Sequence, residues 1–221
     1  MPSPMPLVVV DLMSHRRAYG PMVVASHHRH TAPDRPLVVV GPEDDFATAF
    51  EGAAGIQVTG SVCMLQEDAP WAPGLAEACE DAARDGVPVL GVCFGHQMLG
   101  AHFGATLASW EAPRVGVAPV AFDEGADGPF APGEVALLHT HRDHLIALGP
   151  DLEAVATGGL GGIQAFRHRR LPIWGIQGHP EADAKITRIA EKQDVDAWSD
   201  AELDTPAAKG ILGRFGALLP R

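Results

Sequence analysis

One cysteine lies between two glycines where the sequence changes from a strand-like to a helix-like pattern. Gly91-Val92-Cys93-Phe94-Gly95 follows the apolar stretch 87–90 and precedes the helix-like stretch 96–103. So sharp a turn needs small neighbours, because the central side chain must stand clear of the sheet. A cysteine there also lies at a helix N-terminus, where the helix dipole favours the thiolate. Cys93 is therefore a candidate nucleophile, although read alone it is equally consistent with a small buried hydrophobic residue.

The longer string around this cysteine is more specific than its glycines. PVLGVCFGHQMLG resembles the nucleophile motif of the class I, or triad, glutamine amidotransferases, which share the elbow Cys, a following Gly and a Gln two residues beyond it, here Gln97. The family also has a late His-Pro-Glu segment, which matches Gly178-His179-Pro180-Glu181. The resemblance covers roughly residues 7–192. Three shorter segments are most similar to free-standing, GMP-synthase-like amidotransferase domains: Gly60-Ser61, Asp68-x-Pro70-Trp71 and His141-x-Asp143.

The resemblance implies a catalytic triad of Cys93, His179 and Glu181. Acyl transfer at an amide needs a nucleophile, a base, a group that orients the base, and donors for the oxyanion. Cys93 supplies the thiolate and His179 the base. Glu181 lies two positions beyond His179, so in an extended segment it points the same way and can orient the imidazole. In isolation, the His–Glu pair would be interpreted as a structural contact within a loop.

The resemblance also assigns an oxyanion hole and a substrate pocket. The backbone N–H groups of Phe94 and Gly60 are the expected donors, although Thr59-Gly60-Ser61 lacks the proline of the Gly-Gly-Pro turn in many relatives. Arg142 replaces the usual Gly of the family, and a bulky side chain there would alter the pocket. The residues expected to bind glutamine are Gln97 and, after the strand-like run 135–139, Thr140, His141, Arg142 and Asp143.

Composition restricts the partners and the compartment. The 221 residues carry a net charge of -12, which argues against a nucleic-acid partner. The cluster Arg167-His168-Arg169-Arg170 is interpreted as a solvated strand end. The apolar runs are too short to span a bilayer, and the N-terminus lacks the apolar region of a signal peptide. Three cysteines without paired spacing indicate a reducing compartment, so a cytoplasmic location is expected.

Histidines outside the triad raise the question of a metal site. They form two groups along the chain: His27, His28 and His30, and then His139, His141 and His144. No cysteine or carboxylate completes a recognised ligand spacing with either group. We therefore expect no metal and no other cofactor, and we interpret residues 26–30 as a solvated polar loop.

The elements that must position these residues alternate along the first half of the chain. Strands are expected at 7–11, 37–41, 56–61 and 87–90, and helices at 15–24, 44–50, 73–85 and 96–103. This alternation predicts a parallel sheet covered on both faces. In the second half, antiparallel hairpins are expected from runs at 106–110, 115–122, 135–139, 152–157 and 163–168. A helix at 183–192 and one or two short helices within 197–221 are expected to follow.

These patterns predict one domain over residues 1–221. Its expected fold is a three-layer α/β sandwich of the flavodoxin-like class I amidotransferase type, with a mostly parallel central sheet and a small antiparallel extension. The expected activity is hydrolysis of the glutamine side-chain amide through a Cys93 thioester, giving glutamate and ammonia for an unidentified acceptor or a separate synthetase subunit.

Other interpretations of the same residues stay open. The triad also suits a γ-glutamyl peptidase that acts on a glutathione-like peptide. A non-catalytic interaction module with this fold is a third interpretation, which the intact triad disfavours. An α/β-hydrolase is disfavoured because its acid precedes its histidine, whereas Glu181 follows His179.

Overall fold

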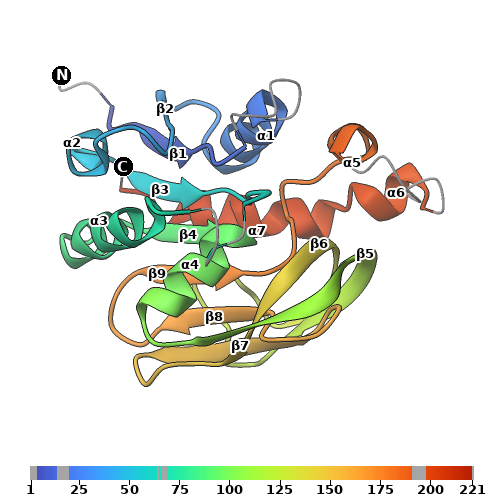
Figure 1. The fold of residues 1–221 in the computed structure, drawn as a ribbon. Helices are drawn as coiled ribbons and strands as arrows, with labels where there is room; N and C mark the ends of the chain where they lie inside the picture. Colours follow the sequence, from blue (N-terminus) through green and yellow to red (C-terminus); the bar gives the residue numbers. More distant parts are fainter. Residues whose placement is uncertain (1–3, 14–19, 64, 66–68, 191–197, 221) are drawn as a thin grey trace.

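One mixed sheet organises the residues described by the computed structural model, which are 4–13, 20–63, 65, 69–190 and 198–220. Its nine strands follow the order β2-β1-β3-β4-β9-β8-β7-β5-β6 (Figure 1). The strands that pair in parallel are β1 (Leu7–Val10), β2 (Leu37–Val40), β3 (Gly55–Val58), β4 (Val89–Val92) and β9 (Ile173–Ile176). The antiparallel continuation consists of β8 (Ala165–His168), β7 (Leu152–Gly158), β5 (Thr106–Phe122) and β6 (Gly133–Ala147).

The strands β1 and β4 are buried on both faces, which explains their continuous runs of apolar residues, whereas the edge strand β2 leaves Val38 and Val39 exposed. In β1, Leu7 and Val9 belong to one core cluster, whereas Val8 and Val10 belong to another. Helices α1 (Gly20–Thr31) and α7 (Pro206–Ala217) cover the first face. The second face is covered by α2 (Phe46–Phe50), α3 (Ala72–Arg84) and α4 (Phe94–His102). The predicted three-layer α/β arrangement is confirmed.

The antiparallel part is larger than the hairpins expected from the sequence. The runs 106–110 and 115–122 form one strand, β5, whose pairing with β6 is irregular between Ser109 and Arg114. Most of that irregular stretch is exposed, so it lacks the apolar alternation that marks a strand. Strand β6 also continues to Ala147, and residues 139–143 therefore lie inside a strand and not after it.

The histidine-rich stretch 26–30 is helical, and the expectation of a polar loop is wrong. It lies within α1, which begins at Gly20. The part of the expected helix at 15–19 lies outside the described residues. Ser26 and His27 are fully buried, so polar side chains share the inward positions of this helix with Val23 and Val24. The apolar periodicity that indicates a helix is consequently weak here.

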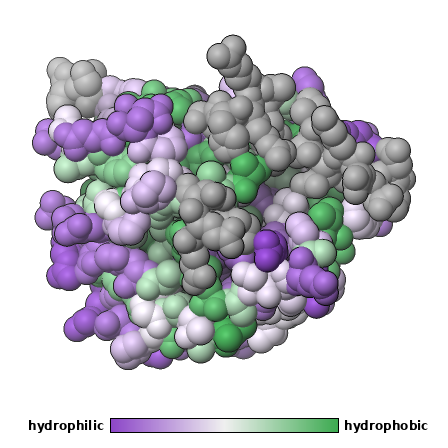
Figure 2. All heavy atoms as spheres, viewed as in Figure 1, coloured by the Kyte–Doolittle hydropathy of each residue, from purple (hydrophilic) through white to green (hydrophobic). Residues whose placement is uncertain are grey.

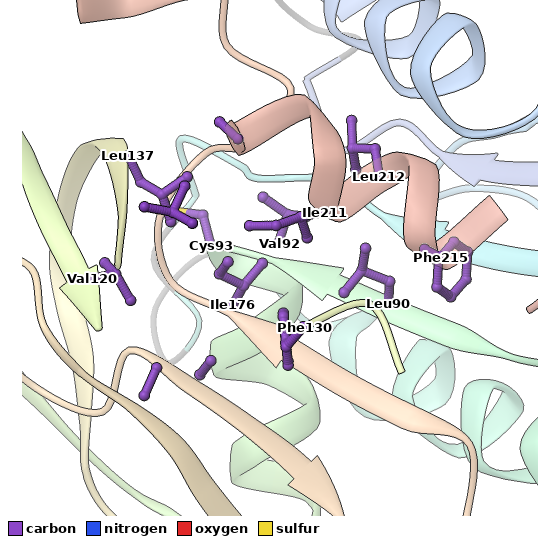
Figure 3. Close-up of a cluster of buried hydrophobic side chains, with 14 of the residues drawn as sticks. Leu90, Val92, Cys93, Val120, Phe130, Leu137, Ile176, Ile211, Leu212 and Phe215 are labelled. Carbon is purple, nitrogen blue, oxygen red and sulfur yellow. The ribbon is translucent and has the colours of Figure 1, made fainter. Parts of the chain in front are cut away.

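The chain after the His-Pro-Glu segment returns to the core. It forms α5 (Ala184–Ala190) and α6 (Asp200–Leu203), and α7 then packs Ile211, Leu212 and Phe215 against the first face of the sheet (Figure 3). The end of the helix expected at 183–192 lies outside the described residues.

Figure 2 shows hydrophilic side chains gathered over α2 and α3 at the left of the molecule. In the described part of the chain, every helix is too short or too polar to cross a membrane.

Candidate active site

Cys93 occupies the sharp turn between β4 and α4, with a backbone φ of 52° and ψ of -101°. It is the one residue other than glycine that has a positive φ in the described part of the chain. This conformation is unfavourable for a residue with a side chain and must be held by its surroundings. Glycines make the close approach possible, because a Cβ on Gly95 would lie 2.7 Å from the Val58 carbonyl oxygen. The Cys93 N–H also donates to the Ile176 carbonyl at 2.8 Å, which ties the turn to β9.

His179 and Glu181 form a buried pair on the segment that follows β9. Nδ1 of His179 lies 2.7 Å from Oε1 of Glu181, and the two residues are 4% and 2% exposed. The His179 N–H donates to the Leu138 carbonyl at 2.8 Å and so forms an isolated bridge to β6. The Ser26 hydroxyl of α1 donates to the Glu181 carbonyl at 2.6 Å. Elements far apart in the sequence therefore fix the position of the pair.

The charges in the pair shift the two pKa values in opposite directions. Burial raises the pKa of Glu181, but the positive charge and hydrogen bond of His179 outweigh burial and hold that pKa well below its usual range. Burial lowers the pKa of His179, whereas the negative charges of Glu181 and Cys93 raise it well above its usual value. The pair therefore favours a protonated imidazole beside a carboxylate.

The second ring nitrogen of His179 faces the reacting side of the site. Nε2 is buried, and the Cys93 side chain raises the pKa of the ring through its charge and a hydrogen bond. Since Nδ1 bonds to Glu181, Nε2 is the atom left to exchange a proton with Cys93 or with a bound substrate. His179, Glu181 and Cys93 thus have the arrangement that a nucleophile, base and orienting acid require.

Both candidate oxyanion donors border the cysteine. A Cβ on Gly60 would lie 3.0 Å from His179 Cε1 and 3.5 Å from Cys93 Cβ, so Gly60 lies directly against His179 and Cys93. Phe94 is the first residue of α4, where backbone N–H groups have no partner within the helix. The expected positions of Gly60 and Phe94 are therefore compatible with an oxyanion hole.

The turn that lacks the proline of many relatives is held by side-chain hydrogen bonds. Oγ1 of Thr59 accepts from the Leu12 N–H at 3.0 Å, and the Ser61 hydroxyl donates to the Leu12 carbonyl at 3.2 Å. These two bonds attach both sides of Gly60 to a residue just beyond the end of β1. The turn therefore has a fixed anchor within this chain.

The residues expected to bind the substrate lie on both faces of β6. His141 and Asp143 are buried, whereas Thr140 and Arg142 are half-buried. Adjacent side chains of a strand point to opposite faces, so Thr140 and Arg142 lie opposite to His141. Nε of Arg142 donates to the Trp110 carbonyl at 2.9 Å. The structure therefore separates the expected set into two groups, which the sequence did not reveal.

His139 joins His141 in lining the site. From the sequence, His139 is considered only as a metal ligand, and no metal is expected. The ring centroids of these two histidines lie 5.8 Å apart, and a Cβ on Gly178 would lie 3.1 Å from His139 Cε1. Burial is the main cause that lowers the pKa of His139 to about 3 and that of His141 to about 4. Both imidazoles are therefore neutral near pH 7. No group of three or more His, Cys, Asp or Glu in the described part of the chain is arranged to hold a metal.

His27 of α1, which the sequence offers only as one of a group of histidines considered for a metal, is a further neighbour of Glu181. It is fully buried, and burial lowers its pKa while the negative charge of Glu181 raises it. A side-chain hydrogen bond with Gln57 also raises the pKa of His27, and Oε2 of Glu181 has no hydrogen-bond partner among the described residues. Helix α1 thus brings a second, neutral imidazole near the carboxylate. The sequence conceals this neighbour, because the polar pattern of residues 26–30 predicts a loop.

An apolar cluster lies behind the nucleophile. Cys93 packs with Val92, Ile176 and Leu137, which come from β4, β9 and β6 (Figure 3). The cysteine itself is 4% exposed. Such a surrounding keeps bulk water away and strengthens the interactions among the charged groups.

A cysteine on a strand-to-helix elbow, beside a buried His–Glu pair on a mostly parallel α/β sheet, defines a protein of the cysteine-dependent acyl-transfer class. The sequence pattern of the family "Glutamine amidotransferase class-I" matches residues 25–191. The chain therefore belongs to the class I glutamine amidotransferase family, as its motifs indicated.

Individual relatives agree with this family. The chain is 27% identical over 144 residues to a glutamine-hydrolysing GMP synthase subunit of Thermoplasma acidophilum, a match that covers 64% of this chain and 70% of the relative. It is 34% identical over 143 residues to aminodeoxychorismate synthase of Streptomyces griseus, covering 54% of this chain but 20% of that protein. It also spans about half, 53%, of the corresponding GMP synthase subunit of Methanospirillum hungatei.

A solved structure supports the fold over the whole chain. The glutamine amidotransferase of Methylobacillus flagellatus superimposes with a TM-score of 0.70 and 18% sequence identity, covering 100% of this chain and 97% of the other. The predicted fold class, with its mostly parallel central sheet and antiparallel extension, is confirmed by this likeness.

Proposed function

We propose that this protein hydrolyses the side-chain amide of glutamine and delivers the ammonia to a separate acceptor enzyme. The observation that carries the proposal is the elbow cysteine beside the His179–Glu181 pair, at a hydrogen-bond distance of 2.7 Å within that pair. The family match over residues 25–191 supports the choice of glutamine. The relative from Thermoplasma, which is named as a glutamine-hydrolysing subunit, supports a separate synthetase partner.

The proposed reaction has two halves. The Cys93 thiolate attacks the amide carbon, and the N–H groups of Phe94 and Gly60 stabilise the negative charge on the oxygen. The C–N bond breaks as His179 gives its proton to the leaving nitrogen, which releases ammonia and forms the thioester. His179 then removes a proton from water, which attacks the thioester carbon and releases glutamate and the thiolate. Glu181 keeps the imidazole oriented throughout.

Substrate binding is assigned in this proposal to the segment 140–143 together with Gln97. The buried Asp143 carboxylate suits the α-amino group of glutamine, whereas the half-buried Arg142 is held by its hydrogen bond to the Trp110 carbonyl. Thr140 and Arg142, on the other face of β6, are therefore assigned to supporting the pocket from behind. His141 borders the substrate as a neutral imidazole.

Replacing Asp143 by Ala should raise KM for glutamine about tenfold and change kcat less, because the carboxylate is assigned to binding and not to bond breaking. Steady-state kinetics measure both constants. Ser109→Ala is the matched control, because Asp143 Oδ1 accepts a hydrogen bond from the Ser109 hydroxyl and this variant removes the bond but keeps the carboxylate.

Arg142→Gly should leave KM within about threefold. A gain in glutamine turnover by Arg142→Gly would instead assign that side chain to the pocket.

The substrate distinguishes an amidotransferase from a γ-glutamyl peptidase with the same triad. A free-standing amidotransferase must limit the waste of glutamine while no acceptor enzyme is bound. The purified chain should therefore hydrolyse glutamine slowly, yet react stoichiometrically at Cys93 with a glutamine-mimicking electrophile. The measurement is kcat/KM for glutamine and for γ-glutamyl-cysteinyl-glycine on the isolated protein.

Two outcomes would contradict this proposal. A preference for the peptide of about tenfold, or about 1.4 kcal/mol at the transition state, would establish the peptidase instead. No reaction of Cys93 with the electrophile would favour the non-catalytic interaction module.

We further propose that these 221 residues act as one domain in a reducing, cytoplasmic compartment, which agrees with a sheet shared by all described strands and with three free cysteines.

A further inference from the structure

A chain of buried amide groups leads from strand β6 to the nucleophile. Nε2 of Gln97 lies 2.7 Å from the Asp143 carbonyl oxygen and 3.2 Å from Oε1 of Gln177. Nε2 of Gln177 in turn lies 3.7 Å from Sγ of Cys93. Gln97 is 4% exposed and Gln177 is 0% exposed, so water does not compete for these contacts. The contacts thus connect β6, α4 and the residue after β9, and Gln177 is the member that reaches the sulfur.

The Asp143 carbonyl, at the start of this series of hydrogen bonds, fixes which end of each glutamine amide faces its neighbour. A carbonyl oxygen can only accept a hydrogen bond, so Gln97 must turn its NH2 group toward Asp143. The same NH2 group faces Gln177, and an NH2 group can only donate, so the facing atom must be the Gln177 oxygen. The Gln177 NH2 group is then the end that points at Cys93.

A donor held in this orientation favours one protonation state of the sulfur. A thiolate accepts hydrogen bonds, whereas a thiol needs an acceptor for its own proton. The oriented N–H of Gln177 therefore favours the thiolate, which is the nucleophilic form. Because Gln97 has both N–H groups engaged, only its Oε1 is left to accept a hydrogen bond from a substrate.

The backbone holds Gln177 at the right distance. Val92 and Ile176 are register partners at the ends of the parallel strands β4 and β9, so Cys93 and Gln177 are the residues that directly follow the two strands. The Gln177 N–H donates to the Gln164 carbonyl at 2.8 Å, which fixes the end of β9 from its other side. The contact with the sulfur consequently follows from the sheet register and not from a mobile loop.

We propose that Gln177 is a catalytic residue that stabilises and positions the Cys93 thiolate, and that Gln97 is a positioning residue that orients the Gln177 amide. The inference rests on the proposed function only in taking Cys93 as the nucleophile. It adds a fourth group to the triad, with a task separate from proton transfer. His179 accepts and returns the proton, while Gln177 holds the charge that remains.

The test is the pH dependence of Cys93 alkylation by iodoacetamide, measured without substrate and resolved at Cys93 by peptide mass spectrometry. Gln177→Leu removes the donor at similar volume and should raise the pH midpoint of alkylation by about one pH unit. Gln177→Glu should raise it further, because a carboxylate repels the thiolate. Gln97→Met should raise it less, because it frees the Gln177 amide to rotate without removing it.

Gln164→Leu is the matched control. Gln164 is also fully buried, but its side-chain NH2 group donates to the Gly161 carbonyl at 2.8 Å and does not contact Cys93. Its alkylation midpoint should equal that of the unaltered protein. Circular dichroism of each variant identifies loss of folding, and the nearly isosteric Gln177→Glu keeps the test available if Gln177→Leu does not fold.

The outcomes separate this inference from the proposed function. Equal midpoints in the unaltered protein and in all folded Gln177 and Gln97 variants would overturn the inference, whether or not the protein hydrolyses glutamine. A raised midpoint in Gln164→Leu as large as that in Gln177→Leu would also overturn it, because any buried amide would then suffice. Raised midpoints with the control unchanged would support it even if glutamine proved to be the wrong substrate.

Discussion

Replacing Cys93 by Ala is expected to reduce glutamine hydrolysis by a factor on the order of 10⁴ or more, as for other triad nucleophiles. The thioester cannot form without the sulfur, and what remains is the weak effect of binding and of the oxyanion donors. Ammonia release by the purified variant, measured against the unaltered protein at saturating glutamine, gives the ratio. Turnover at the unaltered rate would refute the mechanism as a whole.

The other two cysteines provide the controls for this experiment. Cys63→Ala and Cys79→Ala should keep most of the activity, because neither lies beside the His–Glu pair. Burial raises the pKa of the Cys79 thiol, so this residue stays protonated and acts as part of the core beneath α3. Its variant should be compared at a temperature well below its Tm, because removing a buried side chain lowers stability.

Replacing Glu181 by Gln is expected to lower kcat by a factor on the order of 10³ to 10⁴, as for the acid of other triads. The amide cannot stabilise the imidazolium, and its NH2 group favours the wrong tautomer of His179. Because Glu181 is the strongest of the groups that raise the pKa of His179, that pKa should fall in the variant. Cys93→Ala should lower it less, since the cysteine charge ranks below that of Glu181. NMR titration of the His179 ring measures both changes.

The same pair predicts a pH window for stability. The pKa of Glu181 is lower in the folded protein than its usual 4.5, so the pair loses its contribution as pH falls below that value. The pKa of His179 is higher than its usual 6.5, so the contribution is lost as pH rises through the raised value. The difference in unfolding free energy between the unaltered protein and Glu181→Gln should therefore be largest between pH 4.5 and 6.5. Denaturant unfolding at several pH values measures it, and a difference independent of pH would contradict the ion pair.

Features that depend on local chemistry could be predicted from the order of residues alone. The elbow at Cys93 is marked by its two glycines, because no other residue type allows so close an approach of α4 to the strands. The parallel strands are predictable because burial on both faces requires uninterrupted apolar runs. The motifs around Cys93 and around His179 and Glu181 indicated the family from the sequence, because each motif lies within a few consecutive residues.

The remaining groups around the site are placed by contacts between distant parts of the chain. Gln177 contacts Cys93 because β4 and β9 are neighbours in register, and no local pattern specifies the register of strands so far apart in the sequence. Residues 140–143 are divided between two faces because β6 extends past them to Ala147. The sequence did not predict this extension, because the paired strand β5 is irregular and largely exposed there. His27 reaches the neighbourhood of Glu181 because a helix turns polar residues inward. In each case, packing across the fold and not the nearby sequence fixes where the side chain lies.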